Sequence, residues 1–169
     1  MEYFDVIDRE GNATGAVLPK GSALADGQYY VGAHAYICNA QGEYLLQRRA
    51  LDKAFLPGMW EIHMGHVVAG ETGLETIIRE VREEVGLGCA PEDAHYVGRV
   101  VWEDGHHIID VYRIAAEFDV DQLTLQPEEV IGAKAVSKDE MLALIARMDY
   151  RPAAYREMVA AAVQDRWEA

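Results

Sequence analysis

Cysteine, basic residues and long apolar runs are all scarce in this sequence. The two cysteines, Cys38 and Cys89, have neither the spacing of metal ligands nor that of a disulfide framework, so we predict two free thiols. No apolar run approaches the length of a membrane span. The N-terminus has no basic segment followed by an apolar one, so we expect no signal peptide. These absences predict a soluble, cytoplasmic protein without a membrane partner.

Positive charge is the clearest deficit, with 15 Lys and Arg against 29 Asp and Glu and a net charge of -14. An acidic surface attracts neither a nucleic-acid backbone nor an anionic membrane, which excludes both as main partners. A small phosphorylated substrate stays open, because local cations or metal ions can override the net charge. With 169 residues, half of them hydrophobic, the chain can form one well-packed domain.

The order of the predicted elements indicates a single α/β domain over residues 1–169, with an N-terminal hairpin (about 1–27) as an extension. We find no internal repeat, low-complexity segment or linker that divides the chain. Alternating and apolar stretches bounded by turn residues predict strands, and capping signals predict helices. The expected strands are 3–7, 16–18, 29–38, 44–48, 60–63, 65–68, 94–102, 107–118 and 130–136. Two later helices are expected over 141–147, after a capping box at Ser137, and from Pro152 to about Trp167. This pattern is typical of a mixed sheet with helices on its faces.

The segment from Gly65 to Leu87 contains the best-defined helix. Thr72 is a suitable N-cap, Glu75 completes a capping box, and Gly86 stands where a left-handed C-terminal cap belongs. An apolar stripe at helical spacing is formed by Leu74, Ile77, Ile78, Val81 and Val85.

Three carboxylates, those of Glu80, Glu83 and Glu84, gather on a separate face of this helix. Like charges at i, i+4 repel, and anions in the last helical turn oppose the macrodipole. Breaches of local rules of this kind tend to mark functional sites. A divalent cation bound by the carboxylates would remove the conflict.

The same segment fits the template G-x5-E-x7-R-E-U-x-E-E-x-G-U, with U apolar, at every defined position. The matching residues are Gly65, Glu71, Arg79, Glu80, Val81, Glu83, Glu84, Gly86 and Leu87. This is the Nudix box, and the chain resembles the Nudix hydrolase family. The resemblance implies an α/β/α sandwich with a mixed central sheet. It also implies a pyrophosphohydrolase that uses Mg2+ or Mn2+ to cleave a nucleoside diphosphate linked to another moiety. The competing interpretation is an amphipathic helix with a solvated acidic face, which the complete box disfavours.

By this resemblance, oxygen atoms of the box would hold the metal, since hard cations prefer oxygen ligands. The expected ligands are the carbonyl of Gly65 and the carboxylates of Glu80, Glu83 and Glu84. Glu80 or Glu84 would also help to deprotonate the attacking water. Arg79 would orient one of these glutamates by bidentate pairing, and Glu71 resembles the accessory acid near the metal.

Upstream, Arg48, Arg49 and Lys53 form the main basic cluster of an acidic chain. Together with the segment from Leu56 to Trp60, it resembles the family branch that includes isopentenyl-diphosphate isomerase and hydrolase-like relatives. The three cations would bind substrate phosphates, or they are solvated charges at a strand end; the sequence leaves both interpretations open.

Isomerase chemistry is an alternative, and the departures from that enzyme matter. Met64 stands in the place of its proton-donating cysteine, and a thioether cannot donate a proton. Tyr30 replaces a metal-ligating histidine, while the box glutamates are all retained. His66 matches an isomerase ligand and His63 lies nearby; each is either a ligand or a hydrogen-bonded neighbour. The pair of histidines at 106 and 107 is expected to be exposed.

The sequence does not identify the substrate. A further catalytic acid is expected on a loop, with Glu128 and Glu129 better placed than Glu103 and Asp104. Trp60, Trp102 or a tyrosine would stack on a base, or pack in the core. A nucleotide-binding sensor without turnover is a third hypothesis, and the family resemblance suggests a homodimer.

Overall fold

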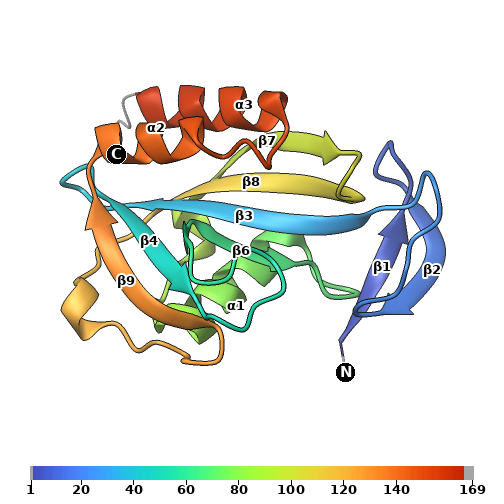
Figure 1. The fold of residues 1–169 in the computed structure, drawn as a ribbon, viewed down its shortest axis with the longest axis horizontal. Coiled ribbons are helices and arrows are strands. Elements are labelled where there is room, and N and C mark those ends of the chain that lie inside the picture. Colours follow the sequence, from blue (N-terminus) through green and yellow to red (C-terminus); the bar gives the residue numbers. More distant parts are fainter. Residues whose placement is uncertain (1, 166–169) are drawn as a thin grey trace.

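The computed structural model describes residues 2–165 as a seven-stranded sheet with helices on both faces and a separate two-stranded sheet. Helix α1 covers one face, and α2 and α3 cover the other (Figure 1). The helices are α1 (Gly73–Val85), α2 (Lys138–Ala146) and α3 (Ala153–Gln164). The strands are β1 (Tyr3–Ile7), β2 (Ala13–Pro19), β3 (Tyr30–Cys38), β4 (Tyr44–Arg49), β5 (Trp60–Glu61), β6 (His63–His66), β7 (Ala94–Trp102), β8 (His107–Ala115) and β9 (Val130–Val136). Two short 3-10 turns, Pro91–Asp93 and Val120–Gln122, lie in the connections.

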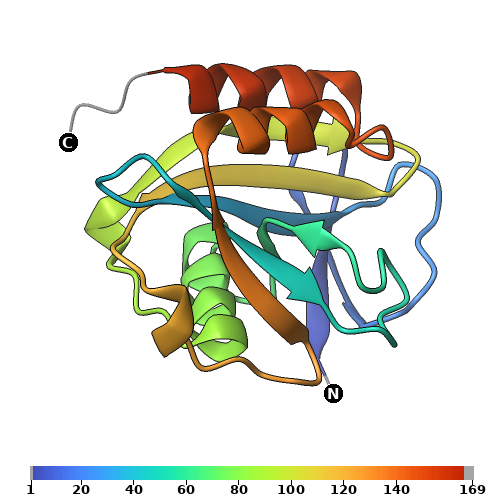
Figure 2. The same cartoon turned by 60° about the vertical axis from the view of Figure 1, so that its left-hand side comes forward.

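The large sheet is mixed. Its strands follow the order β5-β4-β3-β8-β7, with β6 also paired to β3 and β9 to β4. The central pair β3–β8 is parallel, whereas the other pairs are antiparallel. A mixed sheet between two helical layers confirms the predicted α/β/α sandwich, which is seen from the side in Figure 2.

Strand β3 divides the hydrophobic core between the two faces because its side chains alternate. Ala33, Ala35 and Ile37 contact the cluster that contains Ile77 and Val81 of α1. Tyr36, from the alternate positions, belongs to the cluster with Tyr155, Val159 and Val163 of α3. The α1 helix is therefore anchored directly against the centre of the sheet.

Both ends of α1 are capped as the sequence predicts. Thr72 Oγ1 accepts from the Glu75 amide at 3.2 Å, and the Glu75 carboxylate accepts from the Thr72 amide at 2.8 Å. Gly86 is left-handed with φ 72°. A second capping box, at Ser137 and Glu140, begins α2 as expected.

The N-terminal hairpin forms its own sheet from β1 and β2 beside the end of β3 (Figure 1). Phe4 and Val6 of β1 pack on Tyr30, and an isolated bridge joins Ile7 to Tyr29. Its apolar side chains thus extend the core at that end of the sheet.

Several element boundaries differ from the predicted ones. Strand β2 begins at Ala13, because pairing with β1 extends it beyond the predicted apolar residues 16–18. The predicted strand 60–63 divides at Ile62, and β6 ends at His66 rather than at 68. Strand β8 ends at Ala115, and Pro152 is the N-cap of α3 rather than its first residue. The predicted end of that helix, Trp167, lies outside the described residues.

Two further predictions concern the cysteines and the membrane. Cys38 and Cys89 are both free thiols, as predicted. None of the helices within residues 2–165 combines the length and apolar character needed to cross a membrane.

Candidate active site

Gly65 packs closely against the side chain of Glu80. Gly65 is in β6, held by pairing with Ala33 of β3. A Cβ atom added to residue 65 would stand 2.5 Å from Glu80 Cγ and 2.9 Å from its Cδ. The Glu80 side chain therefore occupies the space that any other residue at 65 would need, which brings a carboxylate against the backbone of β6.

Arg79 is the hub of the acidic face. Its guanidinium forms a bidentate pair with Glu71, donating from Nε at 3.1 Å and from Nη2 at 3.0 Å. Nη1 donates to Glu80 at 2.9 Å and to Glu83 at 3.1 Å. The expected bidentate partner was one of the helical glutamates, but the structure gives that place to Glu71, which Thr76 also binds.

Glu84 has a different hydrogen-bond partner from the other two glutamates. Its side chain is buried, with 5% exposure, and its Oε2 accepts from Gln47 Nε2 of β4 at 2.8 Å. Burial raises the pKa of Glu84 to about 7, against the opposing effect of the Gln47 hydrogen bond. A carboxyl group that titrates near neutral pH is suited to accept a proton during catalysis.

The remaining carboxylates of the site differ in electrostatics. Burial raises the pKa of Glu80, while Arg79 acts to lower it. The Arg79 hydrogen bonds lower the pKa of Glu71, which remains ionised at neutral pH. The site thus joins one carboxylate that is firmly charged to two that hold a proton more readily.

The carboxylates do not form a closed metal cage in this structure. Within residues 2–165, no group of three or more His, Cys, Asp or Glu side chains has the arrangement needed to hold a metal ion. The reason is that Arg79 binds Glu80 and Glu83, whereas Glu84 turns to Gln47. The ligand set of Gly65, Glu80, Glu83 and Glu84 therefore stays a prediction, although its donors are the hard oxygens that Mg2+ prefers.

The three predicted phosphate-binding cations border the loop between β4 and β5. Arg48 Nε donates to the carbonyl of Gly58 at 3.0 Å, and Arg49 Nε donates to that of Phe55 at 2.8 Å. Lys53 forms an ion pair with Glu129. Each cation thus contributes to the order of this loop, and a role in phosphate binding stays a prediction.

The four acids proposed as the further catalytic group, Glu103, Asp104, Glu128 and Glu129, have different surroundings. The negative charge of Glu129 raises the pKa of Glu84, which places it near the buried glutamate. Glu103 instead pairs with Arg9 at 2.7 Å and accepts from Tyr29. Glu128 and Asp104 are exposed.

The histidines depart from expectation. His106 and His107 are half-buried rather than exposed, and His107 Nε2 lies 2.7 Å from His66 Nε2 in a hydrogen bond. The turn folds back on β6, which sequence alone did not indicate. His63 is fully buried, and neither ring nitrogen has a hydrogen-bond partner among the described residues. Burial lowers the pKa of His63 to about 3.

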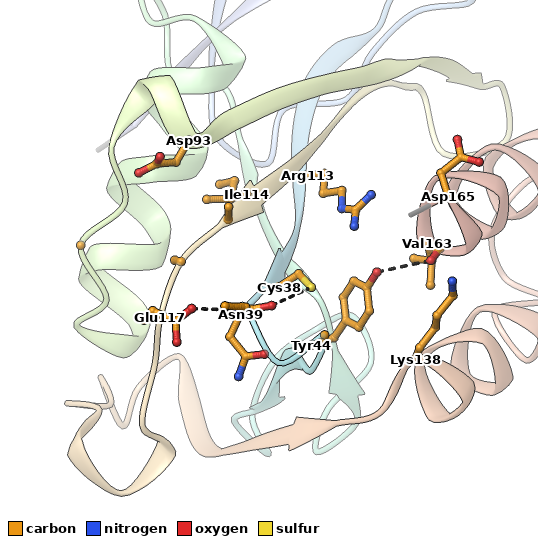
Figure 3. Close-up of a pocket in the computed structure, with 15 residues that line it drawn as sticks. Cys38, Asn39, Tyr44, Asp93, Arg113, Ile114, Glu117, Lys138, Val163 and Asp165 are labelled. Carbon is orange, nitrogen blue, oxygen red and sulfur yellow. Dashed lines mark hydrogen bonds between the residues drawn. The ribbon is translucent and has the colours of Figure 1, made fainter. Parts of the chain in front are cut away.

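A cavity of about 830 Å3 lies elsewhere, where the ends of β3, β8 and α3 meet (Figure 3). Its polar lining includes Arg113, Glu117 and Lys138, and none of the predicted site residues borders it. It is therefore separate from the Nudix-box segment.

Sequence reasoning missed three polar residues. Gln47, which binds Glu84, and Glu61 are both 1% exposed, and Arg151 is 6% exposed. A glutamate between Trp60 and Ile62 in an apolar strand was the one usable signal of a buried acid. Nothing local marks Gln47 or Arg151.

Comparison with known proteins agrees with this geometry. The NUDIX domain family model matches residues 28–158. Nudix hydrolase 3 of Arabidopsis thaliana is 34% identical over 88% of this chain, but the match spans only 21% of that longer protein. An uncharacterized Nudix hydrolase of Listeria monocytogenes is 31% identical over 90% of this chain and 89% of its own length.

Two further similarities concern the isomerase-like branch of the family and the fold. Isopentenyl-diphosphate Delta-isomerase of Escherichia coli is 29% identical over 77% of this chain and 74% of its own length. A crystal structure from Deinococcus radiodurans has a TM-score of 0.74 at 17% identity, covering 97% of this chain and 100% of that one, which shows the fold. The chain belongs to the Nudix family, and its relatives indicate a Nudix pyrophosphohydrolase.

Proposed function

We propose that this protein is an Mg2+- or Mn2+-dependent hydrolase that cleaves the diphosphate linkage of a nucleoside diphosphate joined to another group, or of a related small diphosphate. The observation that carries the proposal is the placement of Glu80 against Gly65, with the buried Glu84 one helical turn further along the same helix. Gly65, Glu80 and Glu84 all belong to the complete Nudix box.

The donor chemistry fits a hard divalent cation. Glu80, Glu83, Glu84 and the Gly65 carbonyl would hold it, and Gln47 offers a buried Oε1 without a hydrogen-bond partner among the described residues. When bound, such a cation neutralises phosphate charge and lowers the pKa of a water molecule.

The chain's own residues supply the other roles. Glu84, buried and bound by Gln47, accepts the proton of the attacking water, and Glu80 is the alternative base. Arg79 positions Glu80 and Glu83 through hydrogen bonds, and Glu71 in turn fixes the arginine. Arg48, Arg49 and Lys53 neutralise the phosphates of the substrate.

The isomerase reaction is the weaker alternative. Met64 stands where that chemistry needs a proton donor, and its sulfur instead accepts from Arg151 Nη2 at 3.4 Å. A nucleotide sensor without turnover requires loss of chemistry despite a complete set of box carboxylates.

The proposal includes a single Nudix domain whose N-terminal hairpin is an extension. It also includes a cytoplasmic location, a homodimer, and no nucleic-acid partner, the last because of the net charge of -14.

The test is a substrate panel of nucleoside triphosphates, nucleotide sugars, dinucleotides and isoprenoid diphosphates, each assayed with Mg2+ and with Mn2+. We expect metal-dependent release of the products of diphosphate cleavage from at least one nucleotide. Conversion of isopentenyl diphosphate to its allylic isomer, or nucleotide binding without any cleavage, would contradict the proposal.

A further inference from the structure

Arg151 is a buried cation surrounded by aromatic rings, on the sheet face opposite α1. It immediately precedes Pro152, the N-cap of α3, and is 6% exposed. The ring centroids of Trp102, Phe55, Tyr150 and Tyr155 lie 5.0, 5.3, 5.7 and 5.8 Å from its Cζ. The ring faces stabilise a cation. Among the described residues, the hydroxyl groups of Tyr150 and Tyr155 are hydrogen-bonded to other side chains and not to Arg151.

Among the described residues, the guanidinium of Arg151 also lacks a carboxylate partner. Within residues 2–165, no acidic group lies within ion-pair distance of it, and the hydrogen bond it donates goes to the sulfur of Met64. Sulfur is a weak acceptor, and a buried charge without a strong partner is costly. The surroundings of Arg151 therefore suit a ligand that brings an oxygen or nitrogen acceptor.

Glu61, which lies beside the same rings, has the complementary feature of a carboxylate oxygen without a hydrogen-bond donor among the described residues. It is 1% exposed; Oε1 accepts from the Tyr150 hydroxyl, while Oε2 has no hydrogen-bond partner among the described residues. Tyr150 thus contacts Glu61 through its hydroxyl and Arg151 through its ring. Burial raises the pKa of Glu61, whereas the Tyr150 hydrogen bond and the positive charge of Arg151 act to lower it. An unfilled acceptor and a poorly paired donor lie in one cluster.

Phe55 covers this cluster from solvent. It lies on the loop between β4 and β5, is 37% exposed, and packs edge-on against Tyr150 at 5.9 Å and tilted against Trp102 at 6.2 Å. A ring from a ligand can replace that of Phe55 and keep the same stacking partners when the loop swings aside.

The cluster adjoins the candidate active site. Met64, which contacts Arg151, is followed directly by Gly65, the residue packed against Glu80. The positive charge of Arg49 acts on both Glu61 and Glu84. A candidate phosphate ligand is therefore near both the cluster and the buried glutamate, as a substrate with its base in one and its diphosphate at the other would require.

We propose that Trp102, Tyr150, Arg151 and Glu61 form the recognition site for the substrate's nucleobase, which takes the place of the Phe55 ring, and that this base carries a ring N–H next to a carbonyl oxygen, as guanine and uracil do. This inference rests on the proposed function and names its substrate class. Arg151 donates to the carbonyl oxygen, Glu61 Oε2 accepts from the ring N–H, and the aromatic rings stack on the base.

The same groups discriminate against other ligands. Adenine and cytosine present an unprotonated ring nitrogen at that position, so its lone pair would face the Glu61 carboxylate. An isoprenoid chain would fill the aromatic space but leave both Arg151 and Glu61 unsatisfied.

The test measures equilibrium binding of GMP, UMP, AMP and CMP to the full chain by titration calorimetry. We expect GMP, UMP or both to bind about tenfold or more tightly than AMP and CMP, because a missing hydrogen bond to a buried charge is penalised heavily. Equal affinity for all four, binding of none, or preference for AMP or CMP would overturn the inference.

Substitutions test whether Glu61 and Arg151 cause the base preference. Glu61→Gln keeps the shape and the acceptor for Tyr150, and we expect it to reduce the base preference to about threefold or less. Arg151→Met should weaken GMP and UMP selectively, and Glu92→Gln, an exposed carboxylate, serves as control. If Arg151→Met fails to fold, Glu61→Gln decides: an unchanged preference, or an equal loss for all four nucleotides, contradicts the assignment.

Monophosphates contain no diphosphate linkage, so their binding does not depend on turnover. Diphosphate hydrolysis without base discrimination would overturn this inference and leave the proposed function intact. Base-selective binding without hydrolysis of any diphosphate would overturn the proposed function and leave this inference intact.

Discussion

Gly65 and Glu80 fit together so closely that a Cβ on residue 65 would lie 2.5 Å from Glu80 Cγ. Pairing of Gly65 with Ala33 prevents the backbone from retreating, so Glu80 would have to move. The glycine that opens the Nudix box is thus required by the position of a glutamate from the helix that follows.

The first prediction concerns this contact. Gly65→Ala should lower kcat/KM for diphosphate hydrolysis about a hundredfold, since a misplacement of about 1 Å costs that much in a catalytic site. Gly88→Ala is the matched control, because a Cβ there meets no atom within 4 Å. Steady-state kinetics with circular dichroism would separate the two variants. Equal activity of both would show that the Glu80 position is unimportant.

The second prediction concerns Glu84 and stability. Its folded-state pKa, about 7, lies above the ordinary value of 4.5, so its contribution to stability is complete below pH 4.5 and is lost as pH rises through 7. Glu84→Gln carries no such charge. The free energy of unfolding of this variant should therefore rise relative to the natural protein by roughly 1–3 kcal/mol between pH 5 and pH 8.

Urea unfolding at the two pH values measures that difference, with Glu92→Gln as an exposed control. A Glu84→Gln difference that stays constant with pH would mean that Glu84 is ionised freely in the folded protein. A salt-bridged carboxylate such as Glu71, whose pKa is lowered, has the opposite pH dependence: its contribution to stability is lost as the pH falls.

The third prediction tests Arg79 as a positioning residue. Arg79→Lys keeps the charge but loses the bidentate pair with Glu71, so activity should fall about tenfold to a hundredfold. The apparent affinity for the activating metal should fall as well, which a purely structural role would not produce. Arg82→Lys, an exposed substitution on the same helix, should leave both quantities unchanged. A loss of stability alone, with normal metal affinity, would argue against positioning.

Local signals predicted the parts of the fold that depend on neighbouring residues. The caps of α1 follow from Thr72, Glu75 and Gly86, which lie within a few residues of the helix ends they stabilise. The parallel pairing of β3 with β8 joins segments about seventy residues apart, and no local pattern specifies it. The sequence indicated a mixed sheet but not its strand order.

In the candidate site, too, local patterns were predictable from the sequence and contacts between distant segments were not. The box grouped Glu80, Glu83 and Glu84 on one helix, and spacing alone assigned them a common face. In the structure, Glu84 is bound by Gln47 of β4, whereas Glu80 and Glu83 are bound by Arg79. The contact of His107 with His66 and the ring cluster around Arg151 also depend on distant segments, which is why sequence reasoning did not find them.

The central claim is that the helical glutamates support metal-dependent cleavage of a diphosphate. The most direct measurement is an Mg2+ titration of diphosphate hydrolysis by the natural protein and by a Glu83→Gln, Glu84→Gln double variant, with folding checked by circular dichroism. We predict that Mg2+ activates the natural protein, that EDTA abolishes its activity, and that the folded double variant loses turnover by about three orders of magnitude or more. A folded double variant with full activity would contradict the account.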